Sequence, residues 1–377
     1  MFKVLMTGAS NIGKAGVATV VFRLGQAMEK DIVQVSYLAQ RGVPDSKYKK
    51  MIEDRGGKLY TMASNQGNKI KRMLNIIKWV ESVYKADNFD IVHINTDTAY
   101  LAAIYLWLAK RAGITKIVCH CHSTMVDENN RLVRGLKVLM HKICCGYVRK
   151  NSDLKLACSA NAGKWLFKND EVTVIPNGFD VDRFKYDEDK REKYRRELGI
   201  DGKFVICSVG RLAYPKNLLF TIDIYKEILK RENNSVLLFI GEGELRREIE
   251  NYVSDTGLSF EQVVLLGNRN DIPELLSASD VFLLPSRFEG LGIVYMEAQA
   301  SGMPVFASDQ VPDETFVTNL IHKINLTDST EQWAMKIMEH RHDDRKEVRE
   351  EIKKKKYDIH AAAMMLQKKY MELRGTD

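Results

Sequence analysis

The chain has 377 residues, of which 45% are hydrophobic and 28% are charged, and this length and composition suit a two-domain α/β protein. None of its apolar runs approaches the ~18–20 residues that a membrane-spanning helix needs, so no such helix is expected. The net charge of +7 permits anionic partners without naming one.

Apolar runs typical of β-strands alternate with helical patterns along the chain, and a charged stretch at 185–197 separates two series of them. Continuous apolar strands flanked by helices predict parallel sheets that are covered on both faces. Two series of similar length predict two Rossmann-like domains, at residues 1–178 and 179–356. The tail at 357–377 reads as an amphipathic helix, which we expect to join the first domain.

The first predicted strand ends in the glycine-rich turn TGASNIGKAG, Thr7 to Gly16. This turn is similar to the phosphate-binding turn of nicotinamide-dependent dehydrogenases, but Ile12 stands where their pattern has its middle glycine. Such enzymes also need a Tyr-x-x-x-Lys pair for proton transfer. That spacing occurs at Tyr186 and Lys190, in the charged stretch where we expect no helix. The turn therefore predicts backbone N–H groups that face a ligand other than a nicotinamide cofactor.

Two predicted helices of the first half, which start at Asn68 and Asn130, mix lysine and arginine with large apolar residues. An ordinary amphipathic helix with a solvated basic face explains this pattern. Docking onto an anionic membrane surface is the alternative interpretation.

Between these two helices lies the predicted strand KIVCHCH, which is followed by Ser123. Because side chains alternate along a strand, His120 and His122 share one face and the two cysteines take the other, which argues against a metal site. The six cysteines form no C-x-x-C pair, and no secretory signal peptide is recognisable. Reduced thiols in a cytoplasmic protein are therefore expected.

In the second half, Arg211 and Lys216 follow the predicted strand FVICSVG. Cations at the carboxyl end of a parallel strand point to the crevice where α/β proteins bind ligands. There they would neutralise negative charge that develops on a departing diphosphate.

Farther along, Glu289 and Glu297 flank the sequence Gly290-Leu291-Gly292, which lies at the expected start of a helix. A helix N-terminus beside glycine offers free N–H groups to a pyrophosphate. Helical rise would separate the two carboxylates by roughly 12 Å along the axis. This spacing suits a ligand with hydroxyls at both ends and phosphates in the middle, which describes a nucleotide sugar.

The segments GRLAYPKN, GEGELRREIE, IPNGFDVDRF and the stretch at 263–309 resemble the family 4 glycosyltransferases of the GT-B fold. The E-x7-E motif with an upstream basic pair is specific to this group, and the resemblance is strongest from Val174 to Asp309. The segment at 308–338 is similar to the branch that builds exopolysaccharides and capsules.

The resemblance implies a retaining, metal-independent enzyme without a cofactor, whose donor is a nucleotide-diphosphate sugar. It places the donor on the second domain, the acceptor on the first and the reaction in the cleft between them. Arg211 and Lys216 would hold the diphosphate, Glu297 would bind the ribose and Glu289 would contact the sugar. The donor-binding residues that it implies are Gly13, Gly16, Gly210, Asn268, Gly290, Leu291, Gly292 and Glu297.

On the acceptor side, the resemblance implies a histidine near the transferred sugar, and His122 fits better than His120 because a loop follows it. Lys14 and Ser159 are weaker candidates on the same side. This chain has Ala15-Gly16 where the family often has two glycines, which leaves the contact made by the first turn open.

A UDP-sugar and a saccharide or lipid-linked saccharide are the expected substrates, with no role for nucleic acid. The expected location is the cytoplasm, with possible contact at the inner face of the membrane. Two alternatives remain open, a sugar-nucleotide epimerase of the same fold and an inactive glycosyltransferase-like partner protein. The intact set of Arg211, Lys216, Glu289 and Glu297 argues against the inactive partner, because a scaffold has no physical need for it.

Overall fold

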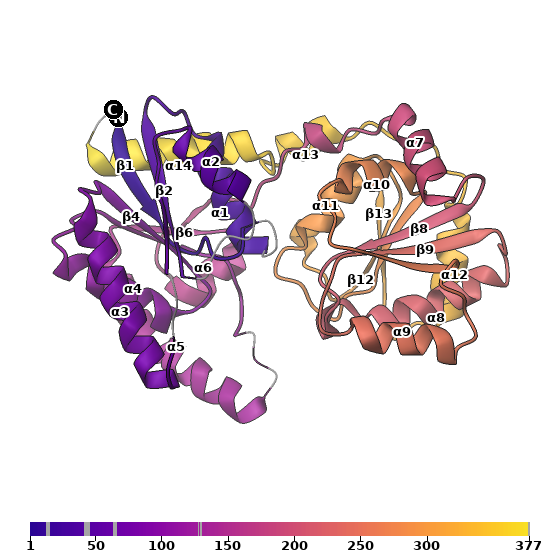
Figure 1. Cartoon of the computed structure of the whole chain (residues 1–377), viewed down its shortest axis with the longest axis horizontal. Helices are drawn as coiled ribbons and strands as arrows, with labels where there is room; N and C mark the ends of the chain where they lie inside the picture. Colours follow the sequence, from indigo (N-terminus) through magenta and orange to yellow (C-terminus); the bar gives the residue numbers. More distant parts are fainter. Residues whose placement is uncertain (13–15, 41–45, 63–65, 127, 129, 376–377) are drawn as a thin grey trace. The chain divides into compact units, whose positions relative to one another are not determined.

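The computed structural model divides into two compact units, each built around its own sheet (Figure 1). It describes residues 1–12, 16–40, 46–62, 66–126, 128 and 130–375. Unit 1 contains Met1–Phe179 and Ile359–Asp377, and unit 2 contains Asp180–Asp358. Within the described residues, no helix combines the length and the apolar character that crossing a bilayer requires.

Unit 1 is built on a seven-stranded sheet in the order β3-β2-β1-β4-β5-β6-β7, and each strand runs parallel to its neighbours. Its strands are β1 (Phe2–Met6), β2 (Val33–Ala39), β3 (Leu59–Thr61), β4 (Ile91–Thr96), β5 (Ile117–Cys121), β6 (Leu154–Ala157) and β7 (Thr173–Val174). All residues of β4 and β5 are buried, as expected for central strands that are covered on both faces.

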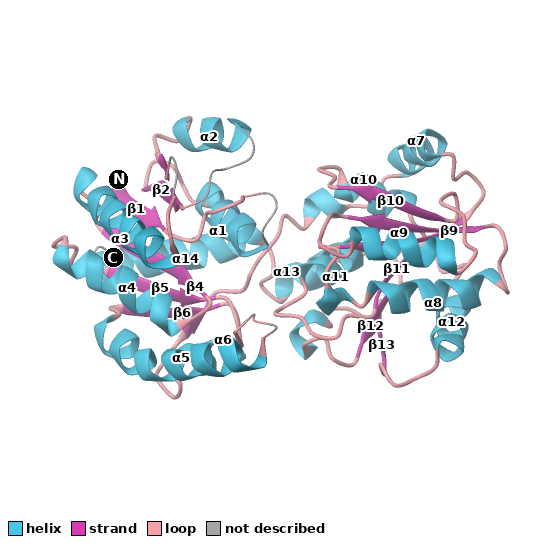
Figure 2. Cartoon of the chain, turned by 60° about the horizontal axis from the view of Figure 1, so that its bottom comes forward, coloured by secondary structure: helices cyan, strands magenta, loops and turns pink. Residues whose placement is uncertain are grey.

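The helices of unit 1 cover both faces of its sheet (Figures 1 and 2). They are α1 (Gly16–Ala27), α2 (Ser46–Glu53), α3 (Lys69–Ala86), α4 (Ala99–Arg111), α5 (Arg131–Asn151), α6 (Ala160–Phe167) and the C-terminal α14 (Ile359–Arg374). The side chain of Asn68 caps α3 and that of Asn130 caps α5, so the two basic helices begin where an asparagine satisfies free N–H groups.

Alternation along β4 shows which helices cover which face. Val92 and Ile94 belong to the apolar core that is shared with α3, α4 and α5. His93, between them, points to the opposite face, where it contacts the hydroxyl of Tyr370 in α14. On that face α14 packs against α1, while on the other α4 packs between α3 and α5.

Unit 2 has a six-stranded parallel sheet in the order β10-β9-β8-β11-β12-β13. Its strands are β8 (Phe204–Val209), β9 (Ser235–Ile240), β10 (Val263–Gly267), β11 (Val281–Leu284), β12 (Val305–Ser308) and β13 (Ile321–Ile324). Its helices are α7 (Glu188–Leu198), α8 (Leu218–Leu229), α9 (Arg246–Asp255), α10 (Ile272–Ala278), α11 (Ile293–Ala300), α12 (Thr330–Glu339) and α13 (Arg349–Lys354).

Helix α7 was not expected, because its sequence EDKREKYRREL lacks an apolar face. Asp187 caps its start and Gly199, in the left-handed conformation, ends it. The helix is held by Arg195, whose guanidinium lies 2.7 Å from a carboxylate oxygen of Asp280. Tyr186 contacts Glu188 and Lys190 contacts Glu274, so neither member of the Tyr-x-x-x-Lys pair is directed at the other.

Candidate functional site

In each sheet, the strand order reverses at one place, where connections on one side run away from those on the other. Open α/β sheets bind ligands at such a switch point. In unit 2 it lies between β8 and β11, because β8 pairs with β9 on one side and with β11 on the other. In unit 1 it lies between β1 and β4. Candidate site residues follow the carboxyl ends of these strands in both units.

The switch point of unit 2 carries an ion pair between Lys216 and Glu289. Lys216 ends the short 3-10 turn Tyr214–Lys216 after β8, and Glu289 lies in the loop after β11. Lys216 Nζ is 2.6 Å from Glu289 Oε1, and the two side chains are 18% and 10% exposed. The sequence placed both residues at the donor, and the fold brings them into direct contact.

Ser286 contacts the Glu289 carboxylate and Tyr295 contacts Ser286, and the sequence analysis missed both residues. Ser286 Oγ donates to Glu289 Oε1 at 2.7 Å, and the hydroxyl of Tyr295 is 2.9 Å from Ser286 Oγ. Burial, with a smaller contribution from the charge of Glu289, raises the pKa of Tyr295 well above its ordinary value. Tyr295 therefore stays protonated, and its one hydroxyl proton faces both the Leu284 carbonyl at 2.8 Å and Ser286 Oγ at 2.9 Å, so Tyr295 positions Ser286 and, through it, Glu289.

Helix α11 begins at Ile293 beside this pair, later than the sequence analysis assumed. Gly292 is its N-cap with φ of 68°, and a Cβ there would lie 2.8 Å from the ring of Tyr295. Glycine has no side chain to cap the first N–H groups, which leaves them available to an anion. Glu297 lies in the second turn, so the axial spacing estimated from a continuous helix does not apply to Glu289 and Glu297.

Arg211 forms its ion pair with a residue outside the Lys216–Glu289 pair. Its side chain is 69% exposed, and it pairs with Glu244 at 3.1 Å. Gly210, by contrast, lies under Lys216, since a Cβ at this position would be 3.3 Å from Lys216 Cε. Gly210 is itself approached by the next loop, because a Cβ on Gly241 would lie 2.0 Å from the Gly210 carbonyl oxygen.

The remaining donor candidates of unit 2 occupy the loops that follow β10 and β11. Asn268 is exposed directly after β10. Leu291 is buried, and its carbonyl accepts a hydrogen bond from the hydroxyl of Thr315. A Cβ on Gly290 would meet no atom within 4 Å, so open space lies beside this position.

In unit 1, the switch point between β1 and β4 is closed by polar contacts to Asn95. Thr7, after β1, accepts from the amide nitrogen of Asn95 through its backbone carbonyl at 3.0 Å. This contact turns the amide oxygen of Asn95 toward His122, whose Nε2 lies 2.8 Å from it. Gly8 lies against the same residue, since a Cβ there would be 3.1 Å from Asn95 Cβ.

These contacts fix the tautomer of His122. Burial lowers the pKa of His122 to about 4, so the ring is neutral near pH 7. Nε2 carries the proton, because it donates to an oxygen that Thr7 holds in place. Nδ1 then accepts. The Asn177 side-chain amide lies against it, with Oδ1 at 3.1 Å, and donates to Nδ1 when its oxygen and nitrogen exchange places.

Three histidines stack behind this position. The rings of His93 and His120 are 5.3 Å apart, and those of His120 and His122 are 4.1 Å apart. As strand alternation predicted, Cys119 and Cys121 face the other way, into the core with α4 and α5. Among the described residues, neither ring nitrogen of His120 has a hydrogen-bond partner.

The surroundings of the acceptor-side candidates therefore distinguish them from one another. His122 is 5% exposed and hydrogen-bonded, whereas His120 is completely buried. Ser159 caps α6 through a bond from the Ala162 N–H at 3.2 Å, which gives it a structural role. Gly16 is the first residue of α1, while Gly13 and Lys14 lie outside the described residues.

Within the described ranges, no group of three or more His, Cys, Asp or Glu side chains could hold a metal ion. The cationic groups at the switch point of unit 2 are lysine and arginine side chains.

Comparison with known families finds two domain models that together span most of the chain. Residues 15–183 match the model described as Glycosyltransferase Family 4, and residues 190–358 match the one described as Glycosyl transferases group 1. The first match ends at residue 183 and the second begins at residue 190, close to the boundary between the two units at Phe179 and Asp180.

Individual proteins point in the same direction. A Bacillus subtilis protein named glycosyltransferase EpsF is 29% identical over 336 residues, which are 86% of this chain and 84% of that protein. An Escherichia coli galactosyltransferase that acts from UDP-Gal on α-D-GlcNAc-diphosphoundecaprenol is 32% identical over 66% of this chain and 65% of its own. The crystal structure of Anabaena HepE with UDP and glucose has a TM-score of 0.71 at 20% identity, and covers 100% of this chain and 98% of that one.

Proposed function

We propose that this chain is a retaining enzyme that moves a sugar from UDP to a saccharide or lipid-linked saccharide. The premise is that the chain belongs to glycosyltransferase family 4 and has the GT-B fold. Its glycosyltransferase class follows from family membership. The nucleotide, the stereochemistry, metal independence and the acceptor are the proposed part.

The Lys216–Glu289 pair is the observation that carries the proposal. A lysine and a glutamate meet at 2.6 Å beside the uncapped start of α11, at a topological switch point. The helix start and Lys216 together favour a diphosphate, while the carboxylate favours sugar hydroxyls. In this proposal Arg211 leaves Glu244 to join the diphosphate, and Glu297 binds the ribose.

The proposed chemistry requires stabilisation of a leaving diphosphate. Lys216 and the N–H groups of α11 offset the charge that develops on it, without a metal ion. The acceptor hydroxyl attacks from the face that the diphosphate leaves, which retains the configuration of the sugar. In unit 1, neutral His122 is held in one tautomer by Asn95, and we assign it to the acceptor side.

The relatives support a UDP donor and a membrane-bound acceptor. HepE was crystallised with UDP, and the E. coli relative acts on a diphosphoundecaprenol-linked sugar. We extend both properties to this chain, together with work at the cytoplasmic face of the membrane in cell-surface polysaccharide synthesis. Helices α3 and α5, which carry mostly basic charge beside exposed apolar residues, suit this location.

The test is nucleotide release from a panel of UDP-, GDP- and ADP-sugars. We expect slow hydrolysis of one UDP-sugar, and a loss of about 100-fold or more in Lys216→Ala and Glu289→Gln. Lys230→Ala is the matched control. Lys230 also forms a 2.6 Å ion pair, with Glu227, but its side chain is 66% exposed, at the end of α8. Thermal melts of all variants separate lost chemistry from lost folding.

Two results would redirect the proposal. If no donor turns over and neither UDP nor GDP shifts the melting temperature, the chain is an inactive partner of another enzyme. If the released product is an epimerised sugar without any acceptor, the chain is an epimerase.

A further inference from the structure

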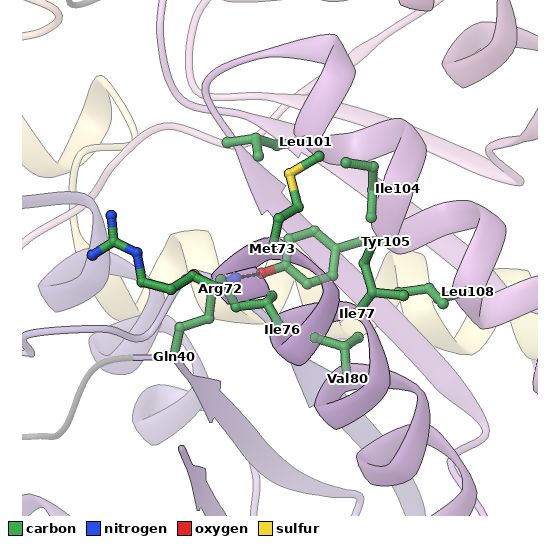
Figure 3. Close-up of a pocket in the computed structure, with 10 residues that line it drawn as sticks. All are labelled: Gln40, Arg72, Met73, Ile76, Ile77, Val80, Leu101, Ile104, Tyr105 and Leu108. Carbon is green, nitrogen blue, oxygen red and sulfur yellow. Dashed lines mark hydrogen bonds between the residues drawn. The ribbon is translucent and has the colours of Figure 1, made fainter. Parts of the chain in front are cut away.

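An apolar pocket lies between α3 and α4 of unit 1 (Figure 3). Its volume is about 450 Å³, which falls within the usual range for small-molecule sites. Its walls come from one face of each helix, at the same spacing of i, i+3, i+4 and i+7. The lining residues are Met73, Ile76, Ile77 and Val80 of α3, Leu101, Ile104, Tyr105 and Leu108 of α4, and Gln40 and Arg72.

The pocket deepens from an exposed mouth to a buried floor. At the mouth, Met73 is 54% exposed and Leu101 is 45% exposed, whereas Val80 and Leu108 at the far end are buried. Seven residues separate the mouth from the floor on each helix, which corresponds to roughly 10 Å of helix. The pocket therefore accepts an elongated apolar group that enters from the surface.

One polar pair lies inside these walls. The side-chain amide of Gln40 donates to the hydroxyl of Tyr105, and Figure 3 shows this bond near Arg72. Burial raises the pKa of Tyr105 to about 12, so the phenol stays neutral and adds no charge to the pocket. The guanidinium of Arg72 points away from the apolar residues, which leaves the interior without charge and the rim with a cation (Figure 3).

The surroundings of the mouth are basic and apolar at once. Helix α3, which carries Arg72 at the rim, has five lysine or arginine residues and one glutamate. Ile70 and Leu74, on the turn that leads to the mouth, are 73% and 52% exposed. An apolar chain with an anionic head matches both features, because the chain fills the pocket while the head meets the basic rim.

We propose that this pocket binds the phosphate-proximal part of a single isoprenoid chain, with the phosphate at Arg72. The inference deepens the proposed function, on which it rests, by assigning the lipid of a lipid-linked acceptor to a site in unit 1. The pocket is one groove between two helices, so it holds one chain rather than the paired chains of a glycerophospholipid.

Equilibrium dialysis of the full chain with radiolabelled farnesyl diphosphate tests the assignment. We expect saturable binding that weakens at least tenfold in Met73→Trp, which fills the mouth, and in Leu101→Trp, which fills it from the other helix. Leu74→Trp is the matched control, because Leu74 neighbours Met73 with nearly the same exposure but does not line the pocket. Its affinity is expected to stay within twofold of the wild type.

A second variant tests the head group. Arg72→Gln is expected to weaken farnesyl diphosphate binding at least fivefold while leaving farnesol binding unchanged. Equal losses for both ligands would remove Arg72 from the phosphate site. Equal losses of affinity in Met73→Trp and Leu74→Trp would show that farnesyl diphosphate binds to the apolar surface and not in the pocket. Binding of phosphatidic acid as tight as that of farnesyl diphosphate would overturn the single-chain assignment.

Nucleotide release by the wild type, measured in the same preparations, separates this inference from the proposed function. Turnover of a UDP-sugar without any binding of farnesyl diphosphate overturns the pocket and leaves the proposed function standing. Pocket binding with no turnover of any donor overturns the proposed function instead.

Discussion

The histidines that stack in unit 1 tie its stability to pH, because burial keeps all three rings neutral. Burial lowers the pKa of His93 to about 3 and that of His122 to about 4, and moves that of His120 well below its ordinary value. In the unfolded chain these rings titrate near pH 6.5. The unfolded state therefore binds more protons below that pH, and the free energy of unfolding falls as the pH drops toward 4.

We predict that His120→Phe makes the stability of unit 1 less dependent on pH, because the unfolded variant has one histidine fewer to protonate. Relative to the variant, the wild type should lose roughly 1–2 kcal/mol of unfolding free energy between about pH 6.5 and pH 5. Urea unfolding followed by tryptophan fluorescence measures it, because Trp79, Trp107 and Trp165 all lie in unit 1. His342→Gln, at an exposed position of unit 2, is the control. If the unfolding free energies of the wild type and His120→Phe changed with pH by the same amount, the prediction would be contradicted.

Single residues also show where sequence reasoning ended. Lys216 and Glu289 were predicted as donor residues from charge, glycine and strand context, and the fold brings them together. Ser286 and Tyr295 were missed, because their role depends on side-chain hydrogen bonds across a turn of loop and helix. The serine three residues before Glu289 was the one available signal. Asn95 escaped notice for the same reason, since its contacts come from β1 and β5, which are distant in sequence.

At the scale of elements, α5 displays an unusual amount of apolar surface. Leu136, Leu139 and Ile143 are spaced to share a face, and they are 60%, 54% and 70% exposed. The same helix carries six basic residues. A helix with exposed apolar side chains and basic charge partitions into the interface of an anionic membrane.

We predict that changing Leu136, Leu139 and Ile143 together to serine weakens binding to anionic vesicles at least tenfold, since each buried leucine or isoleucine contributes about 1.5–3 kcal/mol when fully removed from water. Vesicle co-sedimentation measures it. Melting temperatures should change little, because the three side chains are exposed. Lys71→Glu with Lys78→Glu serves as a comparison whose effect should fade in high salt. Undiminished sedimentation of the triple variant would rule out α5 as a membrane contact.

Helix α7 shows why a helix in a charged stretch could not be predicted from apolar periodicity. Apolar periodicity predicted α3 and α5, because large apolar residues recur along both helices at helical spacing. Helix α7 has no such pattern, and its stability comes instead from Arg191 and Arg195, which both pair with Asp280. Asp280 lies more than eighty residues away, so no local pattern could reveal the pairing.

On the scale of the whole chain, the two series of apolar strands predicted two parallel sheets, and the fold contains them. The strand order could not be read from the sequence, because it depends on which side of the first strand each crossover returns. That order decides the site, since it makes neighbours of β8 and β11 and thereby brings Lys216 to Glu289. The family resemblance named the residues, and the topology supplies the physical reason for their meeting.

The C-terminal helix joins the end of the chain to unit 1, and this arrangement predicts how the chain can be divided. Helix α14 buries Leu366 and Tyr370 completely and packs against α1. Its Gln367 also exchanges hydrogen bonds with Glu29. A fragment of residues 1–179 would expose that apolar surface, at about 1.5–3 kcal/mol for each large side chain, against a total stability of about 5–15 kcal/mol.

We therefore predict that the fragment 1–179 fails to melt cooperatively by circular dichroism, whereas the contiguous fragment 180–358 does so. Adding the peptide 357–377 in trans should restore a cooperative transition to the first fragment, because the helix needs no covalent link to fill its groove. The same peptide with Leu366→Asp is the matched control, since it places a charge where a completely buried leucine belongs. A cooperative transition of 1–179 alone would show that α14 is an accessory to unit 1 rather than part of its core.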